Sequence, residues 1–217
     1  MDPSNVLVQL AATPCGIRES FPVQNDISLE EKGKTAVVLA EHVYSRDFAK
    51  ASQLIIKYHD LFQMVNEKQM RITMFDVIFH TGITSFHMAR ETREAQWIKM
   101  GINVVAAFEK WSKKNAWNFY HSYLLLKAEL HHTKGETNDA IQAYDMSMAV
   151  STKRNGSFKH HSALAAELAA HFFGNIGAKE RSRELIQRSH DLYMEFGANR
   201  KAKAVLNLLE LKWFYES

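Results

Sequence analysis

The strongest constraint on the fold is a 42-residue repeat centred on two glycines, Gly135 and Gly177. Each glycine interrupts a segment in which apolar residues recur with helical spacing. A small residue lies seven positions before the glycine, another lies five positions after it, and a large side chain lies nine positions after it. These positions are Ala128, Ala140 and Tyr144 in the first unit and Ala170, Ser182 and Ile186 in the second. A fixed period of this length is typical of helical repeat proteins.

The second unit predicts two helices joined by a short turn. In ALAAELAAHFFGNIG, residues 163–177, large apolar side chains recur at three- and four-residue steps and mark one broad apolar face. The alanines between them have little bulk, so that a neighbouring backbone can approach closely. Residues 182–196 form a second amphipathic segment that ends at Gly197. Two such segments linked by residues 177–180 predict an antiparallel helical hairpin.

The rest of the chain follows the same pattern except at its start. All three prolines lie within residues 1–28, which are expected to form an irregular N-terminal arm. Helical periodicity dominates residues 29–217, which we predict to be one helical-repeat domain. A weaker copy of the repeat covers residues 37–62, with its turn at RDFAKA, and another hairpin is expected to turn near Glu91–Glu94. The prediction is an all-α fold of about four antiparallel hairpins and a C-terminal helix, stacked as a short solenoid.

Composition limits the classes of partner. The formal net charge is +3, from 27 basic and 24 acidic residues, which is too low to indicate nucleic acid, because phosphate binding needs a concentrated basic face. Cys15 is the only cysteine, so an intrachain disulfide is excluded and a reducing compartment is expected. The sequence shows neither a signal-peptide pattern nor an apolar run of about 18 residues that would span a bilayer. We therefore expect a cytoplasmic protein without membrane insertion.

The two glycine units resemble the tetratricopeptide repeat, in which a small residue, a turn glycine, an alanine and an aromatic residue recur. Agreement is good in the first unit, at Ala128, Gly135, Ala140 and Tyr144. In the second unit, Ser182 and Ser189 stand where that repeat has helix-packing alanines. The period also exceeds the usual ~34 residues, so a longer variant of the repeat is implied.

A narrower resemblance covers residues 75–206, in which NFYHSYLLLKAEL, KGETNDAIQAYDMSMAV, NGSFKHHSALAAELAAHFF and LYMEFGANRKAKAVL occur in that order. This order is similar to the helical-repeat region that follows the AAA-type predicted ATPase in large signalling proteins, which join it to a serine-threonine kinase-like domain and an output module such as a sensor histidine kinase. The matching positions are Asn118, Phe119, His121, Glu129, Gly135, Ala140, Tyr144, Gly156, Phe158, Leu164, Glu167, Ala170, Gly177, Tyr193, Gly197, Ala198 and Lys201. The resemblance implies a fragment or a stand-alone descendant of such a protein, and the family's catalytic residues have no counterparts here.

Short motifs with catalytic or binding chemistry have simpler explanations in this sequence. GKT at residues 33–35 is similar to the end of a phosphate loop, but such a loop needs a glycine five positions earlier, where this chain has Ser28. A helix start is favoured instead, with Ser28 as its N-cap and Glu31 three residues later. The neighbours in the pairs His131–His132 and His160–His161 point apart on a helix, and no HExxH or Cys/His grouping is present. Contact between the two pairs across adjacent repeats is the open alternative. We predict no cofactor, no metal and no catalytic residue.

Four basic residues are the candidates for binding a partner. Arg181 and Arg188 are seven residues apart and share a helix face, and Arg200 and Lys201 follow beyond the next turn. Such a face is suited to clamp an acidic peptide or a phosphoryl group. The simpler alternative is a solvated outer face that keeps the repeat array soluble.

The largest apolar side chains are expected to serve packing. Trp97, Trp111, Trp117 and Trp213 are favoured as core or inter-repeat residues over a ligand-stacking box. The C-terminal segment, residues 202–214, is apolar on two faces. It is interpreted as a junction to a following domain or a second chain, with a capping helix as the alternative.

The favoured function is a non-catalytic protein–protein interaction or regulatory module, whose partner is a protein, a peptide or another domain of a larger signalling protein. The alternative is a helical enzyme or small-ligand carrier with a pocket between hairpins. That alternative requires at least two of His80, His87, His121 and His131 beside a carboxylate. A third hypothesis is a fragment without an independent role.

Overall fold

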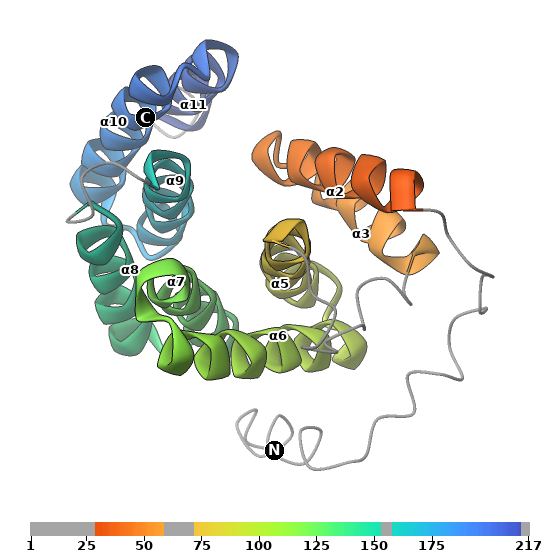
Figure 1. Ribbon diagram of the computed structural model, residues 1–217. Coiled ribbons are helices and arrows are strands. Elements are labelled where there is room, and N and C mark those ends of the chain that lie inside the picture. The colour runs from red at the N-terminus through yellow and green to blue at the C-terminus, as the bar shows by residue number, and fades with distance from the viewer. Residues whose placement is uncertain (1–28, 59–71, 153–157, 214–217) are drawn as a thin grey trace. The chain divides into compact units, whose positions relative to one another are not determined.

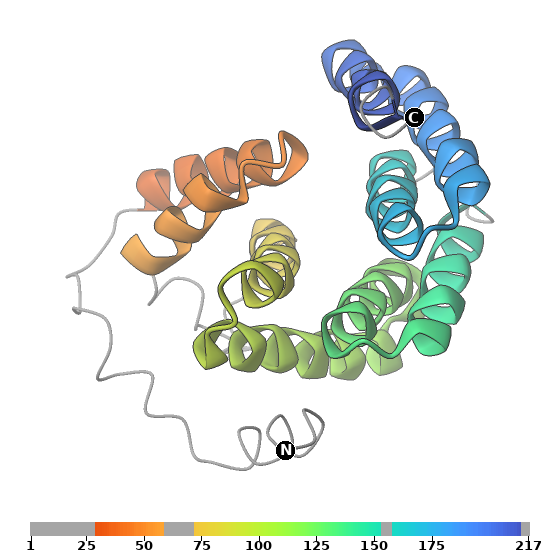
Figure 2. The same cartoon turned by 180° about the vertical axis from the view of Figure 1, so that it is seen from behind.

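The computed structural model describes residues 29–58, 72–152 and 158–213 (Figures 1 and 2). These residues form nine helices and no strand, which confirms the all-α prediction for this part of the chain. The helices are α2 (Leu29–Tyr44), α3 (Phe48–Lys57), α5 (Ile72–Thr92), α6 (Ala95–Lys114), α7 (Ala116–Lys134), α8 (Thr137–Thr152), α9 (Lys159–Asn175), α10 (Lys179–Phe196) and α11 (Asn199–Trp213). The predicted arm, residues 1–28, lies outside the described residues. Within the described ranges, every helix is too short or too polar to cross a membrane.

The chain divides into two compact units. Unit 1 comprises the described residues up to Lys110 together with Thr133–Gly135. Unit 2 comprises Trp111–His132 and the described residues from Glu136 onward. The grouping of residues 29–217 into one repeat domain of about four hairpins stays a prediction.

In unit 1, helices α2, α3 and α5 pack against one another. The predicted turn lies at the start of RDFAKA, where Arg46 and Asp47 separate α2 from α3, and the remaining four residues form the first turn of α3. Arg46 adopts a positive φ of 61°, and the Asp47 carboxylate accepts the backbone N–H of Lys50, which caps α3. Ala51 and Ile55, the counterparts of the repeat's inner positions, are fully buried. The turn and the buried face of α3 therefore follow directly from the local sequence.

Helices α5 and α6 of unit 1 are joined within the predicted turn region Glu91–Glu94, since α5 ends at Thr92 and α6 begins at Ala95. Farther along α6, Gly101 lies against the ring of Phe86 in α5. A Cβ atom at Gly101 would come within 2.5 Å of a Phe86 ring carbon, so this close approach requires glycine. The two helices are consequently packed with no spare room at this point.

Unit 2 is built around α9, which packs beside α8 and α10, while α11 packs on α10 (Figures 1 and 2). The sequence predicted one broad apolar face for this helix. Instead, every residue from 161 to 170 is buried, so α9 is covered on all sides. Alanines occupy the positions between the large side chains and leave room for neighbouring helices on both flanks.

Gly135 and Gly177 end α7 and α9 in the same way. Both adopt positive φ, 74° and 80°, a left-handed conformation that disfavours any side chain. In each turn, the N–H after the glycine donates to a carbonyl five residues back at 2.9 Å, from Glu136 to His131 and from Ala178 to Phe173. This is the Schellman arrangement of a helix C-terminus. Gly197 ends α10 with positive φ as well, and the helix ends predicted at Gly177 and Gly197 are confirmed.

The 42-residue period extends to buried hydrogen bonds. The Ser147 hydroxyl of α8 donates to the His121 carbonyl of α7 at 2.9 Å. The Ser189 hydroxyl of α10 donates to the Ala163 carbonyl of α9 at 2.8 Å. Both the donors and the acceptors are 42 residues apart in the sequence. Hairpins α7–α8 and α9–α10 therefore share this hydrogen bond as well as the apolar pattern.

Ser182 shows how a serine replaces the alanine expected from the repeat. Its counterpart 42 residues earlier is Ala140, which is fully buried, as is Ala128. The Ser182 hydroxyl donates to the Ala170 carbonyl at 2.7 Å. The polar group is thus satisfied inside the hairpin, and the small size that the crossing requires is retained.

Removing either of the two repeated serine hydroxyls is expected to lower the free energy of unfolding by a similar amount. Ser147→Ala and Ser189→Ala each lose one buried hydrogen bond between the two helices of a hairpin, so the free energy of unfolding should fall by about 0.5–1.5 kcal/mol in each case. Urea denaturation followed by circular dichroism measures both values. Ser45→Ala, which removes an exposed hydroxyl, serves as control and should change stability by less than about 0.5 kcal/mol. Values for the two buried serines that differ by more than about 1 kcal/mol would contradict their equivalence.

Candidate functional site

The predicted partner-binding residues lie on α10 and at the start of α11. Arg181 and Arg188 are exposed on α10, whose opposite face is buried in unit 2. Arg200 is exposed in the first turn of α11. We refer to Arg181, Arg188 and Arg200 as the exposed arginines. Their accessibility is what a surface for an acidic partner requires.

Arg181 connects α10 to α8 through an ion pair. Its Nη2 lies 3.1 Å from the Asp145 carboxylate of α8, and its Nη1 lies 3.4 Å from Glu184. The guanidinium also lies 5.8 Å from the centroid of the Phe173 ring. The side chain is still 45% exposed, so these contacts leave part of the guanidinium accessible to a ligand.

Lys201 occupies a different environment from the exposed arginines. Its ammonium donates to Glu167 of α9 at 2.6 Å, and the side chains of Lys201 and Glu167 are 15% and 1% exposed. Tyr193 of α10 donates to the other oxygen of the same carboxylate at 3.0 Å. Through their bonds to Glu167 of α9, Lys201 and Tyr193 therefore connect α11 and α10 to α9.

The histidine pairs of the sequence make contacts that spacing alone did not indicate. His161 of α9 lies against His121 of α7, with Nε2 of His121 2.8 Å from Nδ1 of His161, so one ring donates and the other accepts. The Phe158 ring lies 4.3 Å from the His121 ring, between centroids. Both histidines are buried. This pair ties the first helices of two successive hairpins together.

The other histidines considered for an enzyme pocket lie beside aromatic rings in unit 1. The His80 ring packs edge-on against Tyr44 at 5.6 Å, and the His87 ring stacks on Phe48 at 4.0 Å. The fourth candidate, His131, lies beside the carboxylates of Glu136 and Asp139. A pocket that combines two of these histidines with a carboxylate stays a prediction.

The structure also locates most of the tryptophans and the GKT motif. Trp97 and Trp111 are buried, whereas Trp117 is mostly exposed at the start of α7. The side chain of Trp213 lies outside the described residues, as does Ser28, the expected helix cap. GKT at residues 33–35 lies inside α2, in helical backbone rather than in a phosphate-binding loop.

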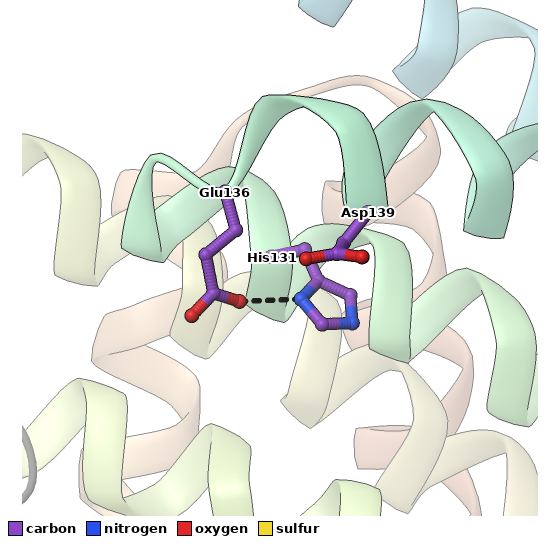
Figure 3. Close-up of side chains that lie close together, drawn as sticks. All are labelled: His131, Glu136 and Asp139. Atoms are coloured by element: carbon purple, nitrogen blue, oxygen red, sulfur yellow. Dashed lines mark hydrogen bonds and ion pairs between the residues drawn. The ribbon is translucent and has the colours of Figure 1, made fainter.

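A cluster that the sequence analysis did not predict lies at the turn between α7 and α8 (Figure 3). The Nδ1 atom of His131 is 2.5 Å from the Glu136 carboxylate. Potential ligand atoms of His131, Glu136 and Asp139 all lie within 4.8 Å of one another. The metal-binding motifs considered from the sequence were HExxH, which has two histidines on one helix, and groupings of cysteine and histidine. This cluster instead has the spacing H-x4-E-x2-D across Gly135, and that spacing beside a turn glycine is the signal that would have indicated it.

No protein-family model, curated protein or solved structure matches this chain. The resemblance to tetratricopeptide repeats and to the helical region of signalling ATPases therefore rests on the residues named for it.

Half-buried His160, at the start of α9, is expected to make stability depend on pH. Its ring lies 5.1 Å from Phe196, and burial lowers the pKa of His160 below its ordinary value of 6.5. The unfolded chain therefore binds this proton more readily than the folded chain. The contribution of neutral His160 to stability is complete above the unfolded pKa and is lost as the pH falls below it.

We expect the free energy of unfolding of the native chain to fall between about pH 7.5 and pH 5.5, and to fall less in His160→Leu. Urea denaturation at both values measures the two differences. The same pH dependence in the variant and in the native chain would show that burial of His160 does not cause it.

Proposed function

We propose that this chain is a tetratricopeptide-like stack of helical hairpins that acts as a non-catalytic interaction module for an acidic segment of a protein partner. The observation that carries the proposal is the repetition of one hairpin, α7–α8 and α9–α10, with the same glycine turn and the same serine–carbonyl hydrogen bond 42 residues apart. Helical repeats use apolar residues to hold neighbouring hairpins together and exposed side chains to bind.

The exposed arginines supply the chemistry of binding. A guanidinium binds a carboxylate through two parallel hydrogen bonds, which gives orientation as well as affinity. Arg188 and Arg200 are exposed, and an acidic segment along α10 would replace Asp145 and Glu184 as partners of Arg181. Lys201 is left out of this surface because its side chain is only 15% exposed and its ammonium binds the buried carboxylate of Glu167.

The resemblance to the repeat region of signalling ATPases and kinases supports a regulatory role. In that setting the partner is either a separate cytoplasmic protein or another domain of a larger signalling protein. The charge of the exposed arginines favours a segment rich in aspartate and glutamate in both cases.

The test is selection of peptides from a random display library on the immobilised full chain. We expect the enriched peptides to be acidic, and Arg188→Glu to weaken the strongest of them by at least about tenfold, because a charge-assisted hydrogen bond contributes about 1.5–3 kcal/mol. Isothermal titration calorimetry measures the dissociation constants. Arg181→Glu should weaken the same peptide as well.

Lys34→Glu is the matched control, since it makes the same change of charge at an exposed position on α2 of unit 1. This variant should bind the selected peptide like the native chain. The proposal is wrong if no acidic sequence is enriched, or if Arg188→Glu and Lys34→Glu weaken binding equally.

A further inference from the structure

We propose that His131, Glu136 and Asp139 form a binding site for a divalent transition-metal ion, with zinc as the ion that fits the ligands best. Among the residues that the structure describes, these three form a cluster of possible metal ligands, because their ligand atoms all lie within 4.8 Å of one another. Figure 3 shows the imidazole of His131 facing both carboxylates. This site is independent of the exposed arginines.

The backbone holds the three residues in place. His131 lies in the last turn of α7, Glu136 directly follows the turn glycine Gly135, and Asp139 lies in the first turn of α8. Glu136 also donates its backbone N–H to the His131 carbonyl at 2.9 Å. The turn at Gly135, with its positive φ of 74°, thus sets the backbone positions of His131 and Glu136 relative to each other.

The spacing suits a small cation. Ligand atoms 2.0–2.2 Å from a tetrahedral zinc ion are separated from each other by about 3.3 Å. The observed separations extend from 2.5 Å, between His131 and Glu136, to no more than 4.8 Å. Glu136 and Asp139 are exposed, so their side chains can change rotamer when an ion binds.

The charges of the cluster also favour a cation. Two carboxylates lie close together beside one imidazole, and their mutual repulsion is relieved when a positive charge lies between them. One nitrogen and two oxygen ligands are a donor set that zinc accepts, whereas calcium prefers six to eight oxygens and copper(I) prefers sulfur. Three protein ligands leave a fourth position for water or for a group of a partner.

Binding at this site would link α7 to α8. Because an ion that binds only the folded chain stabilises it by mass action, zinc should raise the thermal midpoint of the protein. One ligand lies on α7, one in the turn and one on α8, so the gain should depend on all three side chains.

The experiment is calorimetric titration of the full chain with zinc chloride. Asp139→Asn and Glu136→Gln, which replace exposed carboxylates by amides of similar shape, should each weaken the tightest binding event by at least about tenfold, since loss of even an outer-shell partner costs 10–100-fold. The zinc-dependent rise of the thermal midpoint should be lost in the same variants. Circular dichroism without zinc checks that they fold.

Asp191→Asn is the matched control. Asp191 is exposed and lies 2.8 Å from His190, whose hydrogen bond lowers the pKa of the Asp191 carboxyl, but this pair is not part of a three-residue cluster in the described residues. Asp191→Asn should bind zinc like the native chain. The site is refuted if the native chain binds zinc more weakly than about 1 mM, or if Asp139→Asn retains the native affinity and thermal shift.

Discussion

Phe172→Ala is expected to lower the free energy of unfolding by about 3–5 kcal/mol, since it removes a large, fully enclosed ring. Phe172 of α9 is 1% exposed. Its ring lies 5.3 Å from Tyr144 and 5.0 Å from His132, which belong to the preceding hairpin α7–α8. The ring therefore fills the interface between two successive hairpins, and its loss leaves a cavity there. Urea denaturation followed by circular dichroism measures the effect.

Phe196→Ala provides the control with the same chemical change. Phe196, at the end of α10, is 54% exposed, so its truncation should cost no more than about 1 kcal/mol. A cost for Phe172→Ala as small as that for Phe196→Ala would show that the hairpins do not pack as described.

Lys201→Met is expected to cost about 3–5 kcal/mol, because it leaves the carboxylate of Glu167 buried without its cation. Methionine keeps most of the aliphatic stem, so the loss reports the charge rather than the packing. Lys203→Met, two residues away and exposed, is the control and should change stability by less than about 0.5 kcal/mol. Urea denaturation of both variants gives the comparison.

The double variant Glu167→Gln/Lys201→Met separates the ion pair from other effects. Because removal of both charges leaves no buried carboxylate, the double variant should be more stable than Lys201→Met alone. If the double variant instead loses the sum of both single effects, Glu167 and Lys201 do not interact in the folded chain.

Features set by neighbouring residues were predictable from the sequence. The helix ends at Gly177 and Gly197 follow from a glycine after a periodic segment. The turn at RDFAKA was predicted from its place in the repeat, where a turn is followed by a small residue. The equivalence of the two hairpins followed from the 42-residue spacing of Gly135 and Gly177.

Features that depend on distant residues were not predictable. Lys201 appeared to be one more surface cation, since its partner Glu167 lies 34 residues earlier on another helix. His161 lies against His121, 40 residues away, rather than against the pair His131–His132 considered from the sequence. A single sequence does not indicate which distant side chains form pairs, because the pairing depends on how the helices cross.

The polar positions that carried the family resemblance are largely part of the core. Glu129 accepts the Tyr144 hydroxyl at 2.5 Å between α7 and α8, and Glu167 accepts Tyr193 and Lys201 between α9, α10 and α11. Their role in the structure is to hold helices together by buried hydrogen bonds. The proposed binding function therefore rests on other, exposed residues of unit 2, the exposed arginines.

Hydrogen–deuterium exchange of the full chain, with and without the selected acidic peptide, tests the central claim most directly. If the exposed arginines bind the partner, peptide addition should slow exchange in α10, residues 179–196, and in the adjoining residues 137–152 of α8. Slower exchange confined to residues 29–58 or 72–110, or unchanged exchange throughout, would contradict the assignment of this surface.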